Sequence, residues 1–519
     1  MRRMLLPLFV ALGAAGALVL ACAVSAWWWC AAGVLLALTA LAAHDLTQRR
    51  RAVLRNHPLL GRFRRVVAGR HAAGRAEDGR PYGPEVVALV RERAAGAEAP
   101  EPCGTRRDVY AGGHEFLEPS MCPAEVPDEP PVVRVGGPDC TKPYDMALLN
   151  VSAMSFGALS SHAVLALNRG AAKGGFAQDT GEGGLSDHHL RGGGDLIWEI
   201  GTGYFGCRTA EGRFEAREFA DKAALPEVKC VSLKLSQGAH PGAGAILPGV
   251  KVGAEVARTR GVPEGRAVVS PAYHREFSTP REMVCFLARM RELAGGKPTG
   301  FKLCVGSRRQ FLAVCKAMLA EGVTPDFIVV DGAEGGTGAA PAEFPGAVGT
   351  PLTEGLLTVH NALVGAGLRD RVRIGASGGV ATGADIVGRL AQGADYTNAA
   401  RAMMLALGCL QARRCHTGTC PTGIATQDPR RARALDIADK AERVHRYQRA
   451  TVRSACRIMA AAGVRDPAGL VPRLLLRRTD AATVRSYAEL HEWLEPGVLR
   501  AEPPASWRAD WRAADPDVF

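Results

Sequence analysis

Short apolar runs alternate with helical segments from about residue 147 to residue 400, and this alternation restricts the possible fold more than any other feature. Helical patterns at residues 280–293, 310–320 and 383–391 each lie between two such runs. Alternating strands and helices predict parallel βαβ units. Seven or eight units in about 250 residues suit a (β/α)8 TIM barrel of the α/β class. The predicted strands are residues 148–153, 230–235, 267–270, 300–305, 327–330, 372–376 and 396–399.

A doubly wound α/β sheet is the alternative architecture, and a dinucleotide-binding fingerprint would favour it. One formal match to G-x-G-x-x-G occurs at residues 201–206. The motif requires a helix that opens beneath the pyrophosphate, and the residues that follow do not have a helical pattern. We therefore interpret residues 201–206 as a chance match in a chain with 61 glycines.

The stretch from residue 4 to residue 43 contains no charged side chain. One membrane-spanning helix needs about 20 residues, so the stretch is long enough for a two-helix transmembrane hairpin. Arginines lie on both flanks, at 2–3 and 49–51, and basic flanks favour the cytoplasmic side. Tryptophans 27–29 would then lie at the far interface, where this residue is enriched. A cleaved signal peptide is the competing interpretation, although its apolar core usually has only about 7–15 residues.

A block of arginines follows the apolar stretch and contributes much of the formal net charge of +12. Residues 46–75 contain no acid, and their arginines are at positions 49, 50, 51, 55, 62, 64, 65, 70 and 75. The position beside an apolar stretch favours contact with anionic lipid head groups. Nucleic acid and plain solvent are the alternatives, but no aromatic stacking platform or DNA-binding motif accompanies the block. We expect membrane lipid as a partner and no nucleic acid.

Three cysteines, Cys409, Cys415 and Cys420, have the spacing C-x5-C-x4-C. Thiolates on one short loop suit soft iron ions. A cube that lacks one iron needs only three protein ligands, so we predict a [3Fe–4S] cluster on residues 409–420. Zinc held by Cys415, His416 and Cys420 is one alternative, although zinc sites usually have paired C-x2–4-C knuckles. Three inert, buried thiols are the other.

The cysteine content also bears on the compartment. Fourteen scattered cysteines are too few for a disulfide scaffold in 519 residues. A cysteine-bound cluster favours a reducing compartment. The catalytic part is therefore expected to face the cytoplasm, with the chain held in the membrane by two helices.

Residues 408–428 resemble the iron–sulfur loop of glutamate synthase. Four earlier segments are similar, in the same order, to the FMN-binding synthase domain of that family. The resemblance covers about residues 100–480 and is greatest to the stand-alone, membrane-anchored branch, the FMN-binding glutamate synthase family proteins. The four segments are residues 152–160 (SAMSFGALS), 180–184 (TGEGG), 234–249 (KLSQGAHPGAGAILPG) and 331–338 (DGAEGGTG).

The resemblance implies a reaction and its cofactors. Ammonia condenses with 2-oxoglutarate to 2-iminoglutarate, and reduced FMN delivers hydride to the imine carbon. The [3Fe–4S] cluster passes electrons to FMN one at a time from an external donor, ferredoxin or a similar carrier. Carried over by motif, the catalytic residues are Lys302, Lys234, Glu182 and Gln237, and the first segment adds Ser152, Ala153, Met154 and Ser155 as flavin contacts.

The phosphate of FMN is expected at the loops after the last two barrel strands, where barrel enzymes often bind phosphate. Glycines after one strand let backbone N–H groups approach an anion closely. An arginine after the next strand can pair with phosphate. Ordinary tight turns are the alternative. The predicted contacts are Ser377, Gly378, Gly379, Ala399, Ala400 and Arg401.

Lysine is scarce, since only ten of the 64 basic residues are lysines. Lys234 and Lys302 each end an apolar strand, where a buried ammonium group is costly without a partner. A flavin ring oxygen or a substrate carboxylate would suit either, and Gln237 could add an amide at the flavin edge. Glu182 could position the ammonia or the imine, or could form a salt bridge to a lysine. A lysine that points outwards between helices is the alternative.

The expected organisation is a transmembrane hairpin at 1–45, a basic connector at 46–100, the barrel at 101–480 and a C-terminal tail at 481–519. Nothing resembles the glutaminase domain of full-length glutamate synthases, so glutamine hydrolysis is not expected. Two other functions stay open. One is an FMN-dependent dehydrogenase of a 2-hydroxy acid or an amine that donates electrons to a membrane acceptor. The other is a non-catalytic redox sensor.

Overall fold

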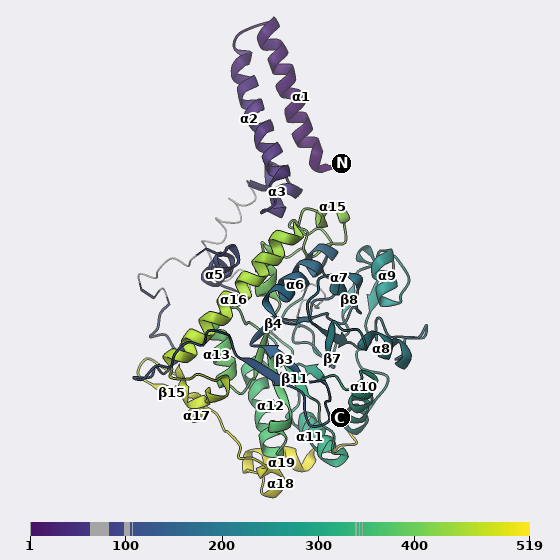
Figure 1. The fold of residues 1–519 in the computed structure, drawn as a ribbon, viewed down its shortest axis with the longest axis vertical. Helices are drawn as coiled ribbons and strands as arrows, with labels where there is room; N and C mark the ends of the chain where they lie inside the picture. Colours follow the sequence, from purple (N-terminus) through teal and green to yellow (C-terminus); the bar gives the residue numbers. More distant parts are fainter. Residues whose placement is uncertain are drawn as a thin grey trace.

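Eight parallel strands close into a barrel (Figure 1), which confirms the predicted TIM barrel. The computed structural model describes residues 2–62, 82–97, 104–105, 107–337, 340–341, 343–344 and 346–519. Arg64, Arg65, Arg70 and Arg75 of the basic block, and Gly338, lie outside the described residues. The barrel strands in order are β4 (Leu149–Val151), β5 (Gln178–Asp179), β6 (Leu196–Ile200), β7 (Val228–Lys234), β10 (Thr299–Leu303), β11 (Phe327–Asp331), β12 (Arg373–Ser377) and β13 (Tyr396–Ala399), and β13 pairs with β4.

Six of the seven predicted strands coincide with barrel strands, but the one at residues 267–270 does not. That run forms β9 (Val268–Val269), which pairs antiparallel with β8 (Ile246–Leu247) in an insertion between β7 and α10. The insertion also contains a short 3-10 helix, η1 (Gly249–Lys251), and α9 (Ala254–Arg260). The other two strands of the barrel are β5 and β6, which sequence reasoning did not identify.

Helices surround the barrel, and local capping explains where several of them begin (Figure 1). Helix α10 starts with a capping box between Thr279 and Glu282 and has Pro280 in its first turn, where the missing proline N–H costs nothing. Helix α13 starts with the corresponding box of Thr382 and Asp385. The surrounding helices are α6 (Ser161–Gly174), α8 (Ala216–Ala223), α10 (Pro280–Leu293), α11 (Arg308–Glu321), α12 (Leu352–Ala366), α13 (Gly383–Ala391), α14 (Arg401–Leu407), α16 (Ile437–Ala461) and, packed on α16, α5 (Pro84–Ala95).

The barrel interior has an apolar part and a polar part. Apolar side chains from the strands, including Ile197, Phe327 and Tyr396, form one buried cluster. Val135 and Met146 join this cluster from a two-stranded ribbon, β2 (Val132–Val135) and β3 (Tyr144–Ala147). Further along the strands, every second residue becomes polar or charged. Because alternate residues of a strand share a face, these polar groups form a layer above the apolar cluster.

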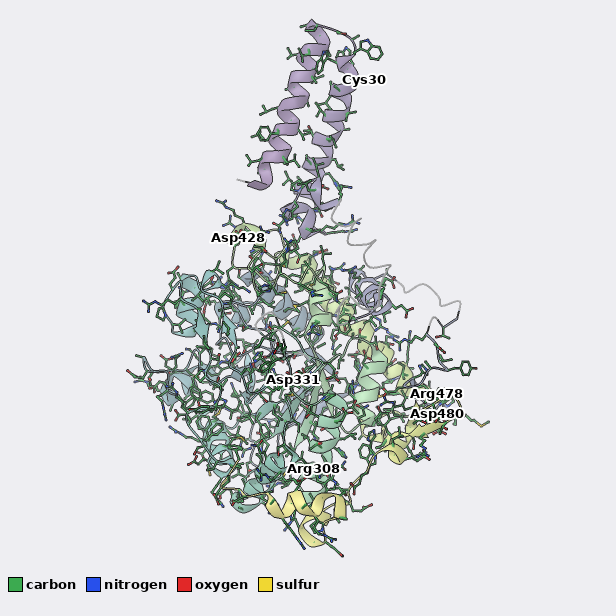
Figure 2. All side chains as sticks on the ribbon, turned by 180° about the vertical axis from the view of Figure 1, so that it is seen from behind. Cys30, Arg308, Asp331, Asp428, Arg478 and Asp480 are labelled. Atoms are coloured by element: carbon green, nitrogen blue, oxygen red, sulfur yellow. The ribbon has the colours of Figure 1, made fainter. Side chains whose placement is uncertain are left out.

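Two apolar helices, α1 (Arg2–Ala23) and α2 (Trp28–Thr47), form a hairpin that projects from the barrel domain (Figure 1). Both are long and apolar enough to cross a membrane, and only 22% and 17% of the candidate spans Met4–Ala23 and Trp28–Thr47 are buried. Such low burial does not suit the core helices of a soluble protein. Figure 2 shows Cys30 near the far end of the hairpin and Asp428 close to its foot.

The foot of the hairpin is bonded to the barrel domain through α3 (Ala52–Asn56). The Asn56 side-chain amide donates to the carbonyl oxygens of Pro421, at 3.1 Å, and Arg431, at 3.3 Å. Arg55 donates to the Ala434 carbonyl oxygen. The hairpin is therefore attached beside the loop that carries the three cysteines, since Pro421 directly follows Cys420.

The segment 481–519, which we described as a tail, is folded against the barrel domain. It contains β15 (Val484–Ser486), α17 (Tyr487–Leu490), α18 (Val498–Ala501) and α19 (Ala505–Ala513). The strand extends a small antiparallel sheet with β14 (Leu475–Arg478) and β1 (Glu115–Leu117). Trp507 of α19 is buried, and Arg308 of α11 lies over its ring. The segment thus completes the outer surface of the barrel.

Candidate active site at the barrel mouth

The polar layer of the barrel contains a buried ion pair between Lys302 and Glu199. Lys302 Nζ lies 2.9 Å from Glu199 Oε2, and the two side chains are 4% and 1% exposed. Burial alone would lower the pKa of Lys302, but Glu199 and Asp331 raise it above its usual value. Sequence reasoning identified Lys302 and missed Glu199. The available signal was one acidic residue inside the apolar run 196–200.

A second carboxyl group of this layer, Asp179, lies near both Glu199 and Lys302. Burial and the neighbouring Glu199 raise the pKa of Asp179 well above its usual value, against the opposing effect of Lys302. The Asp179 carboxyl accepts a hydrogen bond from the Gly181 N–H at 2.9 Å. Because the ammonium group of Lys302 is paired with Glu199, it offsets the raised pKa of Asp179 only in part.

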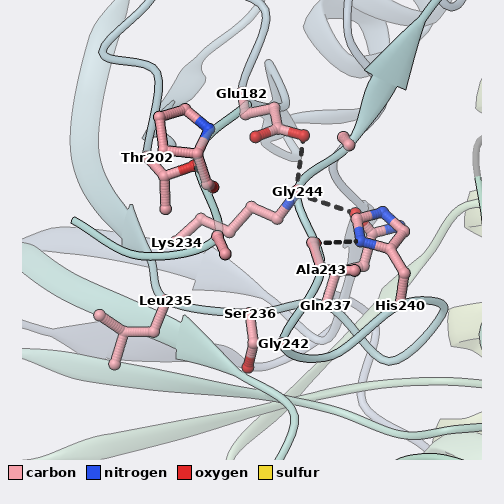
Figure 3. Close-up of a pocket in the computed structure, with 13 residues that line it drawn as sticks. Glu182, Thr202, Lys234, Leu235, Ser236, Gln237, His240, Gly242, Ala243 and Gly244 are labelled. Carbon is pink, nitrogen blue, oxygen red and sulfur yellow. Dashed lines mark hydrogen bonds and ion pairs between the residues drawn. The ribbon is translucent and has the colours of Figure 1, made fainter. Parts of the chain in front are cut away.

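Lys234, Glu182 and Gln237 converge at a pocket above this layer (Figure 3). Lys234 Nζ lies 2.9 Å from Glu182 Oε1 and donates to Gln237 Oε1 at 3.0 Å. Burial alone would raise the pKa of Glu182, but the Lys234 ammonium group brings it below its usual value. Lys234 and Lys302 are register partners on β7 and β10. Like charges at such positions repel, so each lysine has its own carboxylate partner.

His240 also lines this pocket and was not predicted as a site residue. Its Nδ1 lies 3.0 Å from the Ala243 carbonyl oxygen, so Nδ1 must carry the proton and donate it. Burial, together with Lys234, lowers the pKa of His240. Its Nε2 is therefore left as an acceptor. His240 is one of the residues of the 234–249 segment, which was the only signal for it in the sequence.

Two buried residues support the backbone of Lys234. His274 Nε2 lies 2.8 Å from the Lys234 carbonyl oxygen and therefore donates to it, and His274 Nδ1 accepts from the Tyr204 hydroxyl at 3.0 Å. Burial lowers the pKa of His274 to about 4. Tyr204 has φ +48° within residues 201–206, and the next helix, α8, begins only at Ala216. The G-x-G-x-x-G match thus forms a turn that positions Tyr204 and does not open a helix.

Arg260 connects the Lys234 pocket with the loop that carries Ser155. Its Nη2 donates to the Ser155 hydroxyl oxygen at 3.3 Å and to the Phe156 carbonyl oxygen at 3.4 Å. Burial lowers the pKa of Arg260 to about 10, while the nearby Glu182 carboxylate opposes this shift. Arg260 comes from α9 of the insertion and was not predicted, because arginine is too common in this chain to stand out.

The loops predicted to bind a phosphate group lie at neighbouring strand ends. Gly378 and Gly379 have φ of +142° and +68°, and a Cβ on Gly379 would meet nothing within 4 Å. Ser377 Oγ lies 3.2 Å from the hydroxyl oxygen of Ser152, so the two predicted contact sets meet. Arg401 Nη1 donates to the Glu334 carbonyl oxygen. Within the described residues, Arg401 forms no ion pair with a carboxylate.

These features fit FMN. Two buried polar atoms of the strands, Ser232 Oγ and Asn398 Oδ1, have no hydrogen-bond partner within the described part of the chain. Unsatisfied buried groups are costly and call for an additional partner. The open glycine turn and the cationic Arg401 suit a phosphate group. Ala153 and Met154 follow β4, Ala399 is the last residue of β13, and Ala400 follows it.

The three cysteines lie on one irregular loop after α14. Gln411 and Arg413 have φ of +53° each, and the Gln411 N–H donates to Cys409 Sγ at 3.3 Å. Cys420 Sγ lies 3.3 Å from the Thr422 hydroxyl oxygen. Burial raises the pKa of Cys409 to about 12, with further contributions from Cys420 and Cys415. A metal would remove this penalty, because coordinated thiols are deprotonated.

The possible metal ligands around the cysteine loop can be compared with the requirements of a zinc site. Among the described residues, no three His, Cys, Asp or Glu side chains converge as ligands of one metal ion. A tetrahedral zinc site with Cys415, His416 and Cys420 would require such convergence. A [3Fe–4S] cluster takes one thiolate per iron, so its ligands stand apart. Within the described residues the loop does not form a zinc site, and three thiol donors on one loop suit soft iron ions.

Hydrogen bonds join the cysteine loop to the loop that follows β4. Ser160 donates through its backbone N–H to Ile424 and through its hydroxyl to Gly423, each at 2.7 Å. The Gln427 amide donates to the carbonyl oxygens of Gly157 and Leu159 at 3.0 and 2.7 Å. The predicted cluster loop and the predicted flavin loop are thus in direct contact.

Comparison with known proteins shows which family the chain belongs to. A model of the conserved region in glutamate synthase matches residues 140–465. The chain is 40% identical over 371 residues to the glutamate synthase large subunit-like protein YerD of Bacillus subtilis, covering 71% of this chain and 70% of that protein.

More distant relatives are covered less completely. The chain is 34% identical over 315 residues to an archaeal glutamate synthase [NADPH] of Methanocaldococcus jannaschii, covering 60% of this chain and 58% of the relative. It is 34% identical over 281 residues to the large chain of glutamate synthase [NADPH] from Azospirillum brasilense, covering 53% and 17%. The matched region contains the whole barrel and the cysteine loop, and the chain belongs to the glutamate synthase family.

Proposed function

We propose that the chain is a glutamate synthase-type oxidoreductase that uses FMN and a [3Fe–4S] cluster to form glutamate from 2-oxoglutarate and ammonia. The observation that carries the proposal is the buried group of Lys234, Glu182 and Gln237 at the barrel mouth. Family membership supports the general activity, and the phosphate-type loops and the cysteine loop support the two cofactors.

The charges around the pocket suit a dicarboxylate. Lys234 and Arg260 are two buried cations, and Glu182 is the carboxylate near both of them. The surplus positive charge would attract an anionic substrate into the pocket. Because Lys234 and Glu182 are 7% and 10% exposed, water is largely excluded and charge-assisted contacts are strong.

Glu182 suits the nitrogen side of the reaction. Its pKa is below the usual value, so it is ionised at neutral pH and can stabilise a protonated imine or bind ammonium. The Gln237 amide and His240 Nε2 can orient the substrate from the same loop. FMN, when bound, supplies the hydride and the cluster supplies single electrons, and the protein contributes orientation and charge.

The N-terminal hairpin is proposed to anchor the enzyme in the membrane, with the barrel on the cytoplasmic side. Its helices expose large apolar side chains, among them Phe9, Leu12 and Val34. Arg49, Arg50 and Arg51 follow α2 directly, where they can contact anionic lipid head groups. The electron donor is proposed to be an external one-electron carrier of the ferredoxin type.

The test is an anaerobic assay of the purified full-length protein. A chemical reductant, 2-oxoglutarate and ammonium should yield glutamate, and Lys234→Met should lower the rate about 10- to 150-fold, because a charge-assisted contact contributes about 1.5–3 kcal/mol. Lys316→Met, on α11 outside the barrel, should leave the rate unchanged. Cys415→Ser should remove the cluster signal in electron paramagnetic resonance while FMN stays bound.

The same preparation distinguishes the other functions. Reduction of FMN by an added 2-hydroxy acid or amine, without glutamate formation, would identify a dehydrogenase. Loaded cofactors without turnover in either assay would identify a redox sensor. Glutamate formation at equal rates in Lys234→Met and the wild type would contradict the assignment of the pocket.

A further inference from the structure

Lys251 is a buried cation beside the cysteine loop that the proposed function does not use. It ends the 3-10 helix η1 in the insertion after β7, and its side chain is almost completely buried. Its Nζ donates to the Ala158 carbonyl oxygen at 2.8 Å and to the Cys415 carbonyl oxygen at 3.1 Å. The lysine therefore bridges the loop after β4 and the loop that carries the three cysteines.

Lys251 differs from the other buried lysines in its partners. Lys234, Lys302 and Lys440 each form an ion pair with a carboxylate. Within the described residues, Lys251 has no carboxylate partner, and the nearby groups that can become anionic are the Cys415 and Cys420 thiols, which lose their protons when they bind a metal. An uncompensated buried ammonium group is strongly unfavourable. A cluster on the cysteine loop would supply the compensating negative charge.

The hydrogen-bond capacity of Lys251 also indicates a partner on the cysteine loop. An ammonium group has three N–H donors, and two of them are used by backbone carbonyl oxygens. The third is available to a thiolate or to an inorganic sulfide. The lysine stem also packs near the loop, since a Cβ on Gly418 would lie 4.0 Å from Lys251 Cγ.

We propose that Lys251 is the counter-charge of the iron–sulfur cluster and raises its reduction potential. This inference rests on the proposed function, because it requires the cluster on Cys409, Cys415 and Cys420. Reduction of the cluster by the external donor adds one electron and one negative charge, and no bond is broken. A fixed positive charge in a region of low dielectric constant stabilises the reduced form. Hydrogen bonds to cluster sulfurs and local charge are known to set such potentials.

The position of Lys251 also gives it a structural role between the two cofactor loops. Ala158 belongs to the loop at 152–160 that is predicted to contact FMN, and Cys415 belongs to the cluster loop. The ammonium group therefore lies at the junction of the two loops, where electrons would pass. One of its two contacts is to Cys415 itself, a proposed cluster ligand, so the charge would act directly on the cluster.

The test is a redox titration of the holoprotein followed by electron paramagnetic resonance. Lys251→Met keeps the stem and removes the charge, so the one-electron reduction equilibrium should shift at least tenfold towards the oxidised cluster. A tenfold shift corresponds to a midpoint potential about 59 mV lower. Lys251→Arg keeps the charge and should stay within about threefold of the wild type. Iron and FMN contents should be unchanged in both variants.

Lys297→Met is the matched control. Lys297 Nζ also donates to two backbone carbonyl oxygens, those of Ala223 and Leu225 at 2.6 and 2.8 Å. It lies before β10, at the opposite end of the strand from Lys302. Its removal should leave the cluster potential unchanged.

The possible outcomes separate this inference from the proposed function. A full cluster with an unchanged potential in Lys251→Met would overturn the inference and leave the proposed function intact. Absence of iron in the wild-type protein would instead overturn the cofactor assignment. If Lys251→Met loses iron and Lys251→Arg keeps it, the need for a positive charge is supported. Equal loss of iron in both variants would overturn the inferred need for a positive charge at this position.

Discussion

Lys302 and Glu199 neutralise each other inside the barrel, so each depends on the other. Removing one partner of a buried pair typically costs about 3–5 kcal/mol, because the remaining charge is uncompensated. We therefore expect Lys302→Met to lower the free energy of unfolding by about that amount. The double variant Lys302→Met/Glu199→Gln should recover most of the loss. Urea denaturation of the single and double variants measures both effects.

The control for this prediction is Lys316→Met, which removes a partly exposed lysine from α11. Lys316 donates to the Ala514 carbonyl oxygen at 2.8 Å and lies over the Trp511 ring, so its removal should cost about 1–2 kcal/mol, less than the loss of a buried ion-pair partner. A single Lys302→Met variant that is as stable as the Lys316→Met control would show that Glu199 finds another partner or a proton. In that case the polar layer tolerates an unpaired carboxyl group.

His274 makes stability depend on pH in a defined range. Its pKa is lowered to about 4 in the folded protein, against about 6.5 in the unfolded chain. The unfolded state therefore binds more protons between these values, so stability is complete above pH 6.5 and falls as the pH decreases towards 4. The difference corresponds to on the order of 3 kcal/mol.

We expect His274→Gln to reduce the slope of the melting temperature against pH between 4 and 6.5 without abolishing it, because burial also lowers the pKa of His189 to about 3 and that of His360 to about 4. Glutamine can still donate to the Lys234 carbonyl oxygen and does not titrate. His114→Gln is the control, since that ring lies at the surface strand β1 and its removal should keep the acid sensitivity of the wild type. Equal slopes in His274→Gln and the wild type would assign the acid sensitivity to other groups.

At this scale, sequence reasoning identified residues that stand out by type and position. Lysine is rare in the chain, so Lys234 and Lys302 were found, and the glycine-rich segments led to Glu182 and Gln237. Glu199, His274 and Arg260 were missed because their role depends on burial and on which strand faces which. Those relationships arise from the closed barrel and are not visible in local sequence.

At the scale of helices and strands, prediction depended on recognising an apolar run, and the five-residue β6, which contains Glu199, was missed. Strands β7, β10, β11 and β12 contain five to seven residues, and their apolar runs were recognised. Strand β5 contains two residues, Gln178 and Asp179, so it has no apolar pattern. The run at 267–270 is apolar but pairs in an antiparallel ribbon outside the barrel. It was predicted as a barrel strand because nothing in the local sequence distinguishes a two-residue ribbon strand from a barrel strand.

The contact between α6 and the cysteine loop gives a prediction at the same scale. Ser160 caps α6 by accepting from the Ala163 N–H, and its hydroxyl donates to the Gly423 carbonyl oxygen at 2.7 Å. Ser160→Ala should lower stability by about 1–2 kcal/mol through loss of the cap. It should also speed the loss of iron to a chelator, because the loop loses one of its attachments.

Ser307→Ala provides the matched control, because Ser307 caps α11 by accepting from the Gln310 N–H and does not contact the cysteine loop. We expect a similar loss of stability with iron release at the wild-type rate. Thermal melting and iron release measured on both variants separate the two contributions. Faster release in both would mean that global stability alone controls the cluster.

At the scale of the whole molecule, the hairpin predicts a topology. Basic residues flank both ends of the apolar segment, so both ends should lie in the cytoplasm. Reporter fusions after Trp29 and after Arg51 should therefore report opposite sides of the membrane. A fusion after Gly96, beyond α5, is the control and should agree with the one after Arg51. Agreement between the Trp29 and Arg51 reporters would exclude the hairpin.

The bond between Asn56 and the Pro421 carbonyl oxygen has a consequence for how the enzyme would meet its electron donor. Pro421 follows Cys420, so the foot of a hairpin inserted in the membrane, as proposed, would hold the cysteine loop at a constant height above the lipid surface. A donor that associates with the same bilayer would reach the loop by diffusion in two dimensions, not three. It would also meet the loop in a limited range of orientations. The encounter rate would then depend on the density of both proteins in the membrane and on lipid viscosity, and only weakly on the volume of the cell.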